Sequence, residues 1–489
     1  AFPVLAALAA KLGFLVEAAG TAHLIDDPMI TLRVARNVWE HGVPYFNPGE
    51  AVAANTSLFW PILLAPAFGV WEDGAAVHAL FLGSTLLWTG LACWLGARQP
   101  EPVTGLATAV FVALGPWALF YGGSAWEHVP QAVCVAAGFS IWLHGRGGAG
   151  PALACFWLLA ASFLFRPDSA ALVAGFWLAQ IAMLKGEERR RFLAASLPAL
   201  ALPALYLAGM LWFYGDVVPN TYYLKSATLG ENLANGLAYL LEPRESGPVP
   251  ILALVLVSLA PWLGARERVV TALIALQVCI VVALGGDIFP QGRFLLLVLP
   301  TAAALAFRHL AALIGPGPVA LLAVAGATWT LFDPATRKGE ARLAAQLASQ
   351  MTLLESVAPV LEPADGSLGL HFLGLGYHMP RTHVVDFLGK ADPVIARTDP
   401  IEGKIGHDKW DYDHSLGAHD VALMPVHATA HRWVTGDEEP PPGRGWPDYV
   451  RAVLATGRYA YLPPERFCAP TAFGLYLRKD LLARLEAAE

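Results

Sequence analysis

Charged residues are scarce in this chain. Lys, Arg, Asp and Glu make up 15% of its 489 residues, whereas ordinary soluble domains carry about 25%. Hydrophobic residues make up 56%, and they fall in runs of about 16–24 residues separated by short charged or Gly/Pro-rich segments, a pattern typical of membrane-spanning helices. The composition therefore predicts an integral membrane protein. The net charge of -7 gives no indication of a nucleic-acid partner.

Cysteine is also rare, with five residues in the whole chain. Four of them, Cys93, Cys134, Cys155 and Cys279, lie in apolar runs, and Cys468 stands alone in the C-terminal tail. No disulfide framework and no zinc-binding cysteine motif can be built from these spacings. Internal repeats and low-complexity segments are likewise absent from the sequence, apart from a proline-rich loop at Pro440–Pro442.

The apolar runs predict about eleven membrane spans. These spans cover residues 3–23, 74–97, 103–121, 129–145, 150–165, 169–185, 193–214, 249–264, 269–286, 293–308 and 311–332. The first contains Lys11 and Glu17, so it is too polar and too long for the core of a cleavable signal peptide. The stretch from Leu58 to Val70 is apolar but short and is broken by Pro61 and Pro66, which favours an interfacial or re-entrant segment over a crossing.

Basic residues in the short loops predict the orientation of these spans. Lys and Arg fall in alternate loops, at Arg98, Arg146, Lys185, Arg189–Arg191, Arg266, Arg268 and Arg308. Because basic loops stay in the cytoplasm, these loops are expected inside and the others outside. The result is a multi-pass protein of the plasma (inner) membrane whose C-terminal domain is extracytoplasmic.

The hydrophobic runs stop near residue 332, and this predicts two domains. Residues 1–332 form a polytopic transmembrane domain, and residues 333–489 form an extracytoplasmic (periplasmic) α/β domain. The second domain has a helix-like segment at Ala341–Leu361. It also has strand-like segments at Leu368–Leu373, His383–Phe387, Val421–Met424 and Phe473–Leu477. The predicted fold is an α-helical integral membrane protein with a C-terminal extracytoplasmic α/β domain.

Two adjacent carboxylates, Asp26 and Asp27, follow the first apolar run. Pro28 comes next, and Arg33 and Arg36 follow in a helical pattern. Asp27 followed by proline is a common way to start a helix, with Asp as N-cap and Pro at the first helical position. This leaves Asp26 without a structural role, and charge at the lip of a membrane span is expensive unless it serves a function. Asp26 is therefore the first candidate site residue.

Three other outward loops place charge directly beside a span end. Arg166 follows an apolar run and precedes Pro167-Asp168, which puts it at membrane depth. Asp287 and Arg293 flank a Gly/Pro-rich turn that can bring backbone close to a ligand. Each Arg can instead be an interfacial anchor that snorkels to water. Glu127-His128 can equally be a solvated pair in its loop.

The outward loop from Gly215 to Lys225 combines aromatic, amide and cationic side chains. Tyr222 and Tyr223 are ordinary residues for a membrane interface. Lys225 between such aromatic surfaces can also bind a lipid-linked phosphate as a point charge. Asn220 in the same loop is a further candidate for substrate binding.

The loop from Gly406 to His414 in the tail contains His and Asp residues close together. One short loop rarely supplies a defined coordination shell, and the His and carboxylate spacing of a helical metal site is missing. We therefore assign no residue as a metal ligand. We expect the loop, with His407, to pack against the mouth of the membrane domain.

Taken together, the motifs resemble the first outer loop and outer domain of the GT-C superfamily of polytopic glycosyltransferases. The resemblance is narrower to the branch of mycobacterial cell-wall terminal arabinofuranosyltransferases. It is carried by Asp26–Asn37, Gly42, Phe46–Glu50, Leu58–Trp60, Arg166–Asp168, Gly286-Asp287, Arg293-Phe294, Val385–Pro393, Ile395–Arg397 and Gly406–Trp410. The sequence departs from that pattern at Ala51–Thr56, which lacks an acidic residue and a glycine, and at Leu32 and Val34, where aromatic residues are usual.

The resemblance implies an inverting glycosyltransferase with a polyprenyl-phosphate sugar as donor and an envelope glycan, lipid or protein as acceptor. By analogy Asp26 is the general base, Asp27 orients either Asp26 or an Arg, and cations stabilise the departing phosphate. The implied phosphate-binding cations are Arg166, Lys225 and Arg293. The implied substrate-binding residues are Arg33, Glu127, His128, Asp168, Asn220, Tyr222, Tyr223, Asp287 and His407.

Several choices stay open at the level of sequence. The sugar can be arabinofuranose or a hexose, and a divalent cation can assist the reaction. Membrane lipids are expected partners and nucleic acid is not. A transporter or lipid flippase is the first alternative, but it would favour charges in mid-span or repeated broken helices, which the sequence lacks. A non-catalytic envelope scaffold and a lipid-linked phosphoryl transfer are the others.

Overall fold

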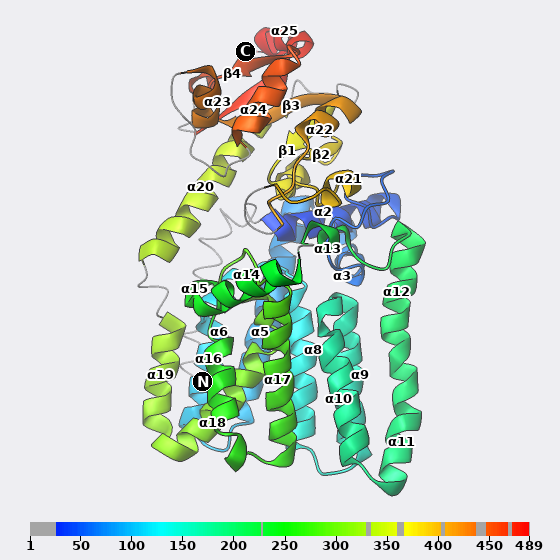
Figure 1. The fold of residues 1–489 in the computed structure, drawn as a ribbon, viewed down its shortest axis with the longest axis vertical. Coiled ribbons are helices and arrows are strands. Elements are labelled where there is room, and N and C mark those ends of the chain that lie inside the picture. Colours follow the sequence, from blue (N-terminus) through cyan, green and yellow to red (C-terminus); the bar gives the residue numbers. More distant parts are fainter. Residues whose placement is uncertain are drawn as a thin grey trace.

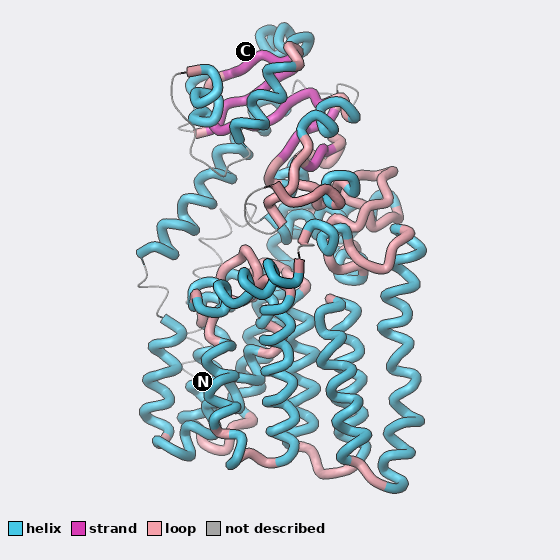
Figure 2. The backbone as a smooth tube through the Cα atoms, in the orientation of Figure 1, coloured by secondary structure: helices cyan, strands magenta, loops and turns pink. Residues whose placement is uncertain are grey.

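The chain forms a bundle of roughly parallel helices with a small sheet-containing domain at one end (Figures 1 and 2). The computed structural model describes residues 26–225, 228–328, 334–358, 366–401, 406–436, 446–467 and 472–488. The predicted first span at 3–23, the loop at Pro440–Pro442 and Cys468 lie outside these residues.

The bundle consists of helices at or near the positions of the predicted spans. They are α5 (Asp73–Ala97), α6 (Pro102–Leu114), α8 (His128–His144), α9 (Ala149–Phe165), α10 (Ala170–Met183), α11 (Gly186–Ser196), α12 (Ala201–Tyr214), α16 (Val249–Ser258), α17 (Ala265–Ala283), α18 (Leu299–Ile314) and α19 (Pro316–Thr328). A 3-10 turn at Leu197–Leu200 joins α11 to α12. Within the described part of the chain, two segments, 73–97 and 186–214, are long and apolar enough to cross a membrane, and shorter apolar helices of 10–17 residues accompany them. The number of crossings therefore stays a prediction.

The outside of the bundle is apolar. Leu197, Trp212, Leu254, Trp262 and Leu321 are all well exposed, although burial of such side chains is strongly favourable in water. In a membrane protein this surface faces lipid, and every backbone polar group of the helices is satisfied within its own helix. The exposed belt is thus the surface expected for a membrane protein.

Small residues allow one close helix contact in the bundle. A Cβ atom on Gly96 would lie 2.6 Å from the carbonyl oxygen of Gly105, and the reverse holds for Gly105. Helices associate in lipid through this kind of close backbone approach, because no hydrophobic effect drives them together there. Glycine at these two positions therefore lets α5 pack directly against α6.

Three predicted spans are interrupted near the outer end of the bundle. The run 103–121 breaks at Gly115 into α6 and the short α7 (Pro116–Phe120). The run 269–286 ends as a helix at Ala283, because Gly285 and Gly286 adopt positive φ angles of 86° and 78°. The run 293–308 becomes α-helical only at Leu299, after a 3-10 turn at Arg293–Leu295. These interruptions free loop residues to line a cavity.

The segments predicted as outer loops contain short helices. The stretch Leu58–Val70 holds α3 (Phe59–Leu64) and α4 (Ala67–Val70), each too short to cross a membrane. Residues 215–247 hold α13 (Asn220–Leu224), α14 (Leu229–Leu241) and α15 (Pro243–Ser246). Helix α14 lies across the end of the bundle (Figure 1). Its exposed leucines recur every four residues, at Leu229, Leu233, Leu237 and Leu241. A leucine face of this kind suits the membrane interface.

The C-terminal domain, named the outer domain after the side of the membrane that the sequence predicts for it, is built on a five-stranded sheet in the order β2-β1-β3-β5-β4. Its strands are β1 (Ser367–Leu370), β2 (Val384–Asp386), β3 (Val421–His427), β4 (Tyr459–Leu462) and β5 (Phe473–Arg478). Strand β1 pairs in parallel with β2 and β3, and β5 pairs antiparallel with β3 and β4. Four strands lie at predicted positions, and β4 is an additional edge strand. The predicted division into two domains stays a prediction.

Helices cover both faces of this sheet. They are α20 (Pro334–Val357), α22 (Tyr412–Ala418), α23 (Ala428–Thr435), α24 (Trp446–Ala455) and α25 (Lys479–Ala488). The short α21 (Pro393–Ala396) packs against α13. Alternate strand residues point to opposite faces, so that Leu475 joins the core with α20 and α25 while Tyr476 joins the core with α22 and α24.

Helix α2 (Asp26–His41) connects the bundle to the outer domain. Its Ile30 and Val34 belong to the same hydrophobic core as Leu370 of β1 and Leu373, the first residue of the 3-10 segment η9 (Leu373–His378). The two adjacent carboxylates stand in the first turn of α2, where negative charge is favourable. The fold therefore places Asp26 and Asp27 at the junction of the two parts of the molecule.

Candidate active site

A cavity of about 520 Å³ lies at this junction. Its charged wall contains four cations, Arg166, Lys225, Arg293 and Lys390, and three carboxylates, Asp27, Glu127 and Asp168. Another part of the cavity wall is apolar. It comes from the last turns of α17 and the loop after them, at Ile280, Val281, Leu284 and Ile288. The cavity is therefore amphipathic.

Three of the cations surround one aromatic ring, that of Phe294. The ring centroid is 4.3 Å from Lys225 Nζ, 5.0 Å from Arg293 Cζ and 5.3 Å from Arg166 Cζ. An aromatic face attracts cations, and Phe294 reaches this place because the helix that follows it begins only at Leu299. The structure thus brings together the three cations that the sequence analysis nominated from three separate loops.

Carboxylates fix the two guanidinium groups. Arg166 donates from Nη1 to Glu127 at 2.7 Å and from Nε to Asp168 at 2.9 Å. Arg293 makes two bonds of 2.6 Å to Asp287 and a third of 2.6 Å, from Nη1, to Asp27. Bidentate pairing of this kind fixes a guanidinium group in position. Both Arg side chains are therefore rigid parts of the wall.

Lys225 is less tightly held. Among the described residues its carboxylate contact is to Asp287, at 3.5 Å. Burial, opposed by Asp287 and assisted by the neighbouring Arg293 and Arg166, lowers the pKa of Lys225 to about 8. An ammonium group has three N–H donors, so Lys225 retains hydrogen-bonding capacity for an anionic ligand.

The two adjacent carboxylates have different environments. Asp27 accepts from Lys390 Nζ and from Arg293 Nη1, both at 2.6 Å. Asp26 accepts from the backbone N–H of Gly374 at 2.6 Å and from Lys390 Nζ at 3.3 Å. Asp27 lines the cavity and Asp26 lies beside it. The predicted pair is therefore joined by one shared lysine.

These environments shift the pKa values of the two carboxyl groups in opposite directions. Burial raises the pKa of Asp26 above its usual value, and the charge of Lys390 only partly opposes this. For Asp27 the same cost of burial is overcome by the charges of Lys390 and Arg293, so its pKa is lowered. A raised pKa is what a general base near neutral pH requires. Asp26 is thus the more basic carboxylate of the pair.

Lys390 also lines the cavity, although it was not predicted as a site residue from the sequence. This lysine lies in a tight turn of the outer domain, in which Asp386 accepts from the backbone N–H of Leu388 at 2.9 Å and of Ala391 at 2.7 Å. Asn220 donates to the carbonyl oxygens of Gly389 and Lys390 at 2.7 and 3.1 Å. The motif Val385–Pro393 carried the resemblance, but nothing in it indicates the partner of the lysine. Asn220 therefore positions Lys390 from outside the cavity.

Two other residues that the resemblance nominated line the cavity, and a third lies outside it. Tyr222 and His407 line the cavity, and burial together with the charge of Lys390 lowers the pKa of His407 to about 3, which leaves it neutral at pH 7. Tyr223 lies outside it, donates to Asp216 at 2.7 Å and carries Arg397 over its ring at 3.8 Å.

Arg33 also lies outside the cavity lining. Its guanidinium group donates to the carbonyl oxygens of Phe46 at 2.9 Å, Met379 at 3.1 Å, Thr382 at 2.9 Å and Gly376. Backbone carbonyls buried away from water need such donors. Arg33 therefore ties α2 to the outer domain.

His128 is fully buried behind Phe294, with the two rings stacked at 27° and 6.4 Å between centroids. Its Nδ1 atom is 3.9 Å from Glu127. Neither ring nitrogen has a hydrogen-bond partner among the described residues. Its place is therefore beneath the aromatic ring rather than in the cavity wall.

The fold of the chain resembles one that is already known. The structure is similar to that of ArnT from Cupriavidus metallidurans bound to undecaprenyl phosphate, with a TM-score of 0.55, 13% identity and coverage of 97% of both chains. The chain therefore shares the fold of this solved structure. No family model matches the chain.

Two relatives match in sequence, and both are terminal β-(1→2)-arabinofuranosyltransferases. The Mycobacterium tuberculosis protein is 30% identical over 243 residues, or 44% of this chain and 37% of the relative. The Corynebacterium glutamicum protein is 29% identical over 232 residues, or 42% of this chain and 33% of the relative. The match thus spans about a third of the length of these curated relatives. The resemblance to this branch of the GT-C superfamily is confirmed.

Proposed function

We propose that this protein is a membrane glycosyltransferase that moves a sugar from a polyprenyl-phosphate donor to an acceptor of the cell envelope. The observation that carries the proposal is the amphipathic cavity, in which three cations around Phe294 stand beside an apolar wall. A phosphate needs cationic donors, and a prenyl chain needs apolar surface. The outer face of the plasma membrane is the proposed side of the reaction.

The donor phosphate binds against Lys225, with Arg166 and Arg293 behind it. Lys225 has donors to spare, whereas both Arg side chains are already paired. The prenyl chain follows the apolar wall at Val281 and Leu284, and Leu284 is well exposed, so the chain can leave the cavity toward lipid. The similar protein ArnT, whose structure holds undecaprenyl phosphate, supports this class of donor.

Sugar transfer proceeds in one displacement at the anomeric carbon, and the residues at the junction supply the base and the cations that it needs. The acceptor hydroxyl oxygen attacks the anomeric carbon from the face opposite the phosphate, which inverts the configuration. The bond from the anomeric carbon to the phosphate oxygen breaks, and the phosphate leaves with the electron pair. Asp26 takes the hydroxyl proton. The cations stabilise the charge that grows on the leaving phosphate.

Asp27 contributes by holding cations rather than by taking a proton. Its two bonds of 2.6 Å fix Lys390 and Arg293, and its lowered pKa makes it a weak base. Lys390 in turn lies between both carboxylates. The two carboxylates therefore have separate tasks.

Arabinofuranose is the sugar to test first, since both sequence relatives are named arabinofuranosyltransferases. A hexose is the alternative, because the phosphate and the prenyl chain of the donor would be the same. An envelope glycan, lipid or protein is the acceptor class. The stretch Ala51–Thr56, which departs from the family pattern, includes Asn55 and Thr56, and both of these line the cavity.

The direct test is transfer of radiolabelled sugar from a panel of polyprenyl-phosphate pentoses and hexoses to an envelope extract of the native host. We expect transfer from at least one donor by the purified full-length protein. Absence of transfer from every donor, with a folded protein that moves the lipid between leaflets of a vesicle, would support a flippase. A folded protein with neither activity would support an envelope scaffold.

Lys225 predicts a specific pH dependence of donor binding. Its pKa of about 8 means that it loses its proton as pH rises through that value. Affinity for a short-chain polyprenyl phosphate should therefore fall between about pH 7 and 9, because a neutral amine no longer attracts the phosphate. Binding should be measured by tryptophan fluorescence or calorimetry at fixed ionic strength.

The matched variant is Lys225→Arg, which stays charged over this range. Its affinity should be nearly independent of pH from 7 to 9. Lys185→Met, on the basic segment at the opposite end of the bundle, should behave like the wild type. An equal decline in wild type and Lys225→Arg would remove Lys225 as the phosphate-binding group.

A further inference from the structure

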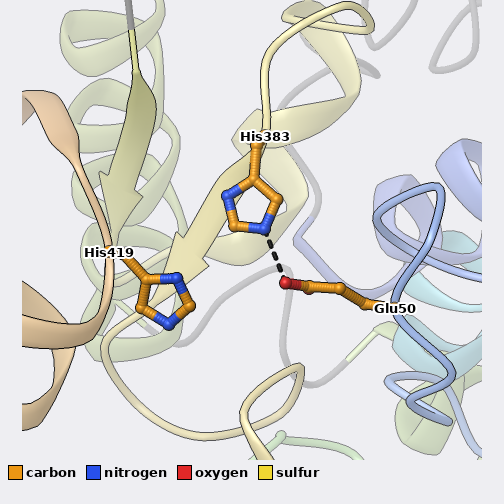
Figure 3. A group of neighbouring side chains, drawn as sticks. All are labelled: Glu50, His383 and His419. Carbon is orange, nitrogen blue, oxygen red and sulfur yellow. Dashed lines mark hydrogen bonds and ion pairs between the residues drawn. The ribbon is translucent and has the colours of Figure 1, made fainter.

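A second cluster of ionisable side chains lies outside the cavity. Figure 3 shows Glu50, His383 and His419 facing one another. Glu50 comes from the loop between α2 and α3, His383 directly precedes β2, and His419 lies between α22 and β3. One potential ligand atom from each residue lies within 4.8 Å of the others.

The dimensions of the cluster suit one metal ion. Zinc binds imidazole nitrogen and carboxylate oxygen at about 2.0–2.2 Å, so two ligands of a tetrahedral ion lie about 3.4 Å apart. The Nε2 atom of His383 is 2.7 Å from Oε1 of Glu50. Small side-chain movements would therefore admit an ion between these groups and His419.

Neighbouring groups orient the candidate ligands. Ser367 Oγ bonds to Nδ1 of His383 at 2.8 Å, which leaves Nε2 directed at the cluster. Asn47 donates to Oε2 of Glu50 at 2.8 Å, which leaves Oε1 directed at the same point. In metal sites, the histidine nitrogen or carboxylate oxygen that does not bind the metal is commonly held by a hydrogen bond of this kind. The arrangement thus has the supporting bonds of a metal site as well as its ligands.

His419 adds a third, independent indication. No hydrogen bond from the described residues reaches its ring nitrogens, although the ring stacks on His383 with centroids 5.7 Å apart. On its other side lie Asp392 and His414, which are 3.1 Å apart and form a second potential ligand set with the same histidine. A half-buried imidazole between two carboxylate–histidine pairs is well placed to be a ligand.

We propose that the protein binds a zinc ion through Glu50, His383 and His419. Two imidazoles and one carboxylate are a ligand set that zinc favours, with a fourth position left for water or another group. The ligands come from three separate segments, none of them within the loop 406–414, so no local spacing in the sequence indicates the site.

The ion would fasten the two parts of the molecule together. Glu50 belongs to the loop that follows α2, whereas His383 and His419 belong to the sheet domain. Asp392, beside the cluster, follows the turn that carries Lys390. Zinc would thus hold the sheet domain in position over the cavity. This inference does not depend on the transfer reaction.

The test is the zinc content of the full-length protein. The protein is purified in detergent with a histidine-free tag, incubated with zinc chloride, dialysed and analysed by mass spectrometry. We expect one zinc ion per chain for wild type and a loss of at least about tenfold in zinc affinity for His419→Ala and Glu50→Ala. A chelator should lower the thermal unfolding temperature of wild type but not of His419→Ala.

Two control variants keep the result interpretable. His41→Ala removes an exposed histidine at the end of α2 and should retain zinc. His414→Ala separates the two ligand sets and should also retain it. Zinc retained by His419→Ala, or absent from the wild type, overturns the site. Zinc lost from His414→Ala but kept by Glu50→Ala overturns the assigned ligands.

Discussion

Replacing Asp26 by Asn is expected to reduce sugar transfer by about a hundredfold or more, the usual cost of removing a general base. The amide keeps the size of the carboxylate, and its oxygen can still accept from the N–H of Gly374. It cannot take the proton of the acceptor hydroxyl. The fold and the affinity for polyprenyl phosphate should therefore remain, and the maximal rate should fall. Single-turnover transfer with saturating donor is the measurement.

A control and a pH profile make this result specific. Asp448→Asn, on the exposed face of α24, should transfer at the wild-type rate. In wild type the rate should fall as pH falls through the raised pKa of Asp26, because protonation removes the base. Asp26→Asn should lack this acid limb. A variant that retains both the rate and the acid limb would show that the base is another group.

Much of the bundle could be predicted from sequence because the evidence is local. Apolar runs such as 74–97 became helices with nearly the predicted bounds, since each helix satisfies its own backbone. Helix α14 was missed inside a predicted loop, although its leucines at intervals of four residues follow a helical period. The edge strand β4 was also missed, and its burial pattern, buried at Tyr459 and Leu462 only, does not alternate with the period of a strand.

The candidate site could be predicted only in part, because its contacts join distant segments. Arg293 was nominated, but its bond to Asp27, 266 residues away, appears only in the fold. Arg33 was nominated through the resemblance carried by Asp26–Asn37. Its donors instead reach carbonyl oxygens more than 340 residues away, which no local pattern could indicate. The shared lysine at 390 was missed for the same reason.

Gly374 shows the same limit at the level of the backbone. A Cβ atom there would collide with the backbone of Asp26, so only glycine lets the outer domain approach this closely. The approach delivers the N–H that binds Asp26. A glycine in a segment read as loop or strand end gives no sign of this contact. The outer domain is thus part of the candidate site rather than an addition to it.

Replacing Lys390 by Met is expected to lower transfer near neutral pH by about a hundredfold, which corresponds to about 2.7 kcal/mol of barrier. Lys390 is the cation shared by the two carboxylates, at 3.3 Å from Asp26 and 2.6 Å from Asp27. Without it, two buried carboxylates face each other with Arg293 as the remaining cation. Because an opposite charge favours the ionised form, its loss raises the pKa of Asp26 further.

This argument gives Lys390→Met a signature that loss of stability would not produce. The acid limb of its rate profile should move to higher pH, and raising the pH should restore part of the rate. Lys390→Arg should lie closer to wild type, and Asn220→Ala, which loosens the turn, should shift the limb less. Lys479→Met, exposed elsewhere on the outer domain, is the matched control. An unshifted limb in Lys390→Met would mean that this lysine joins the two parts of the molecule without tuning the base.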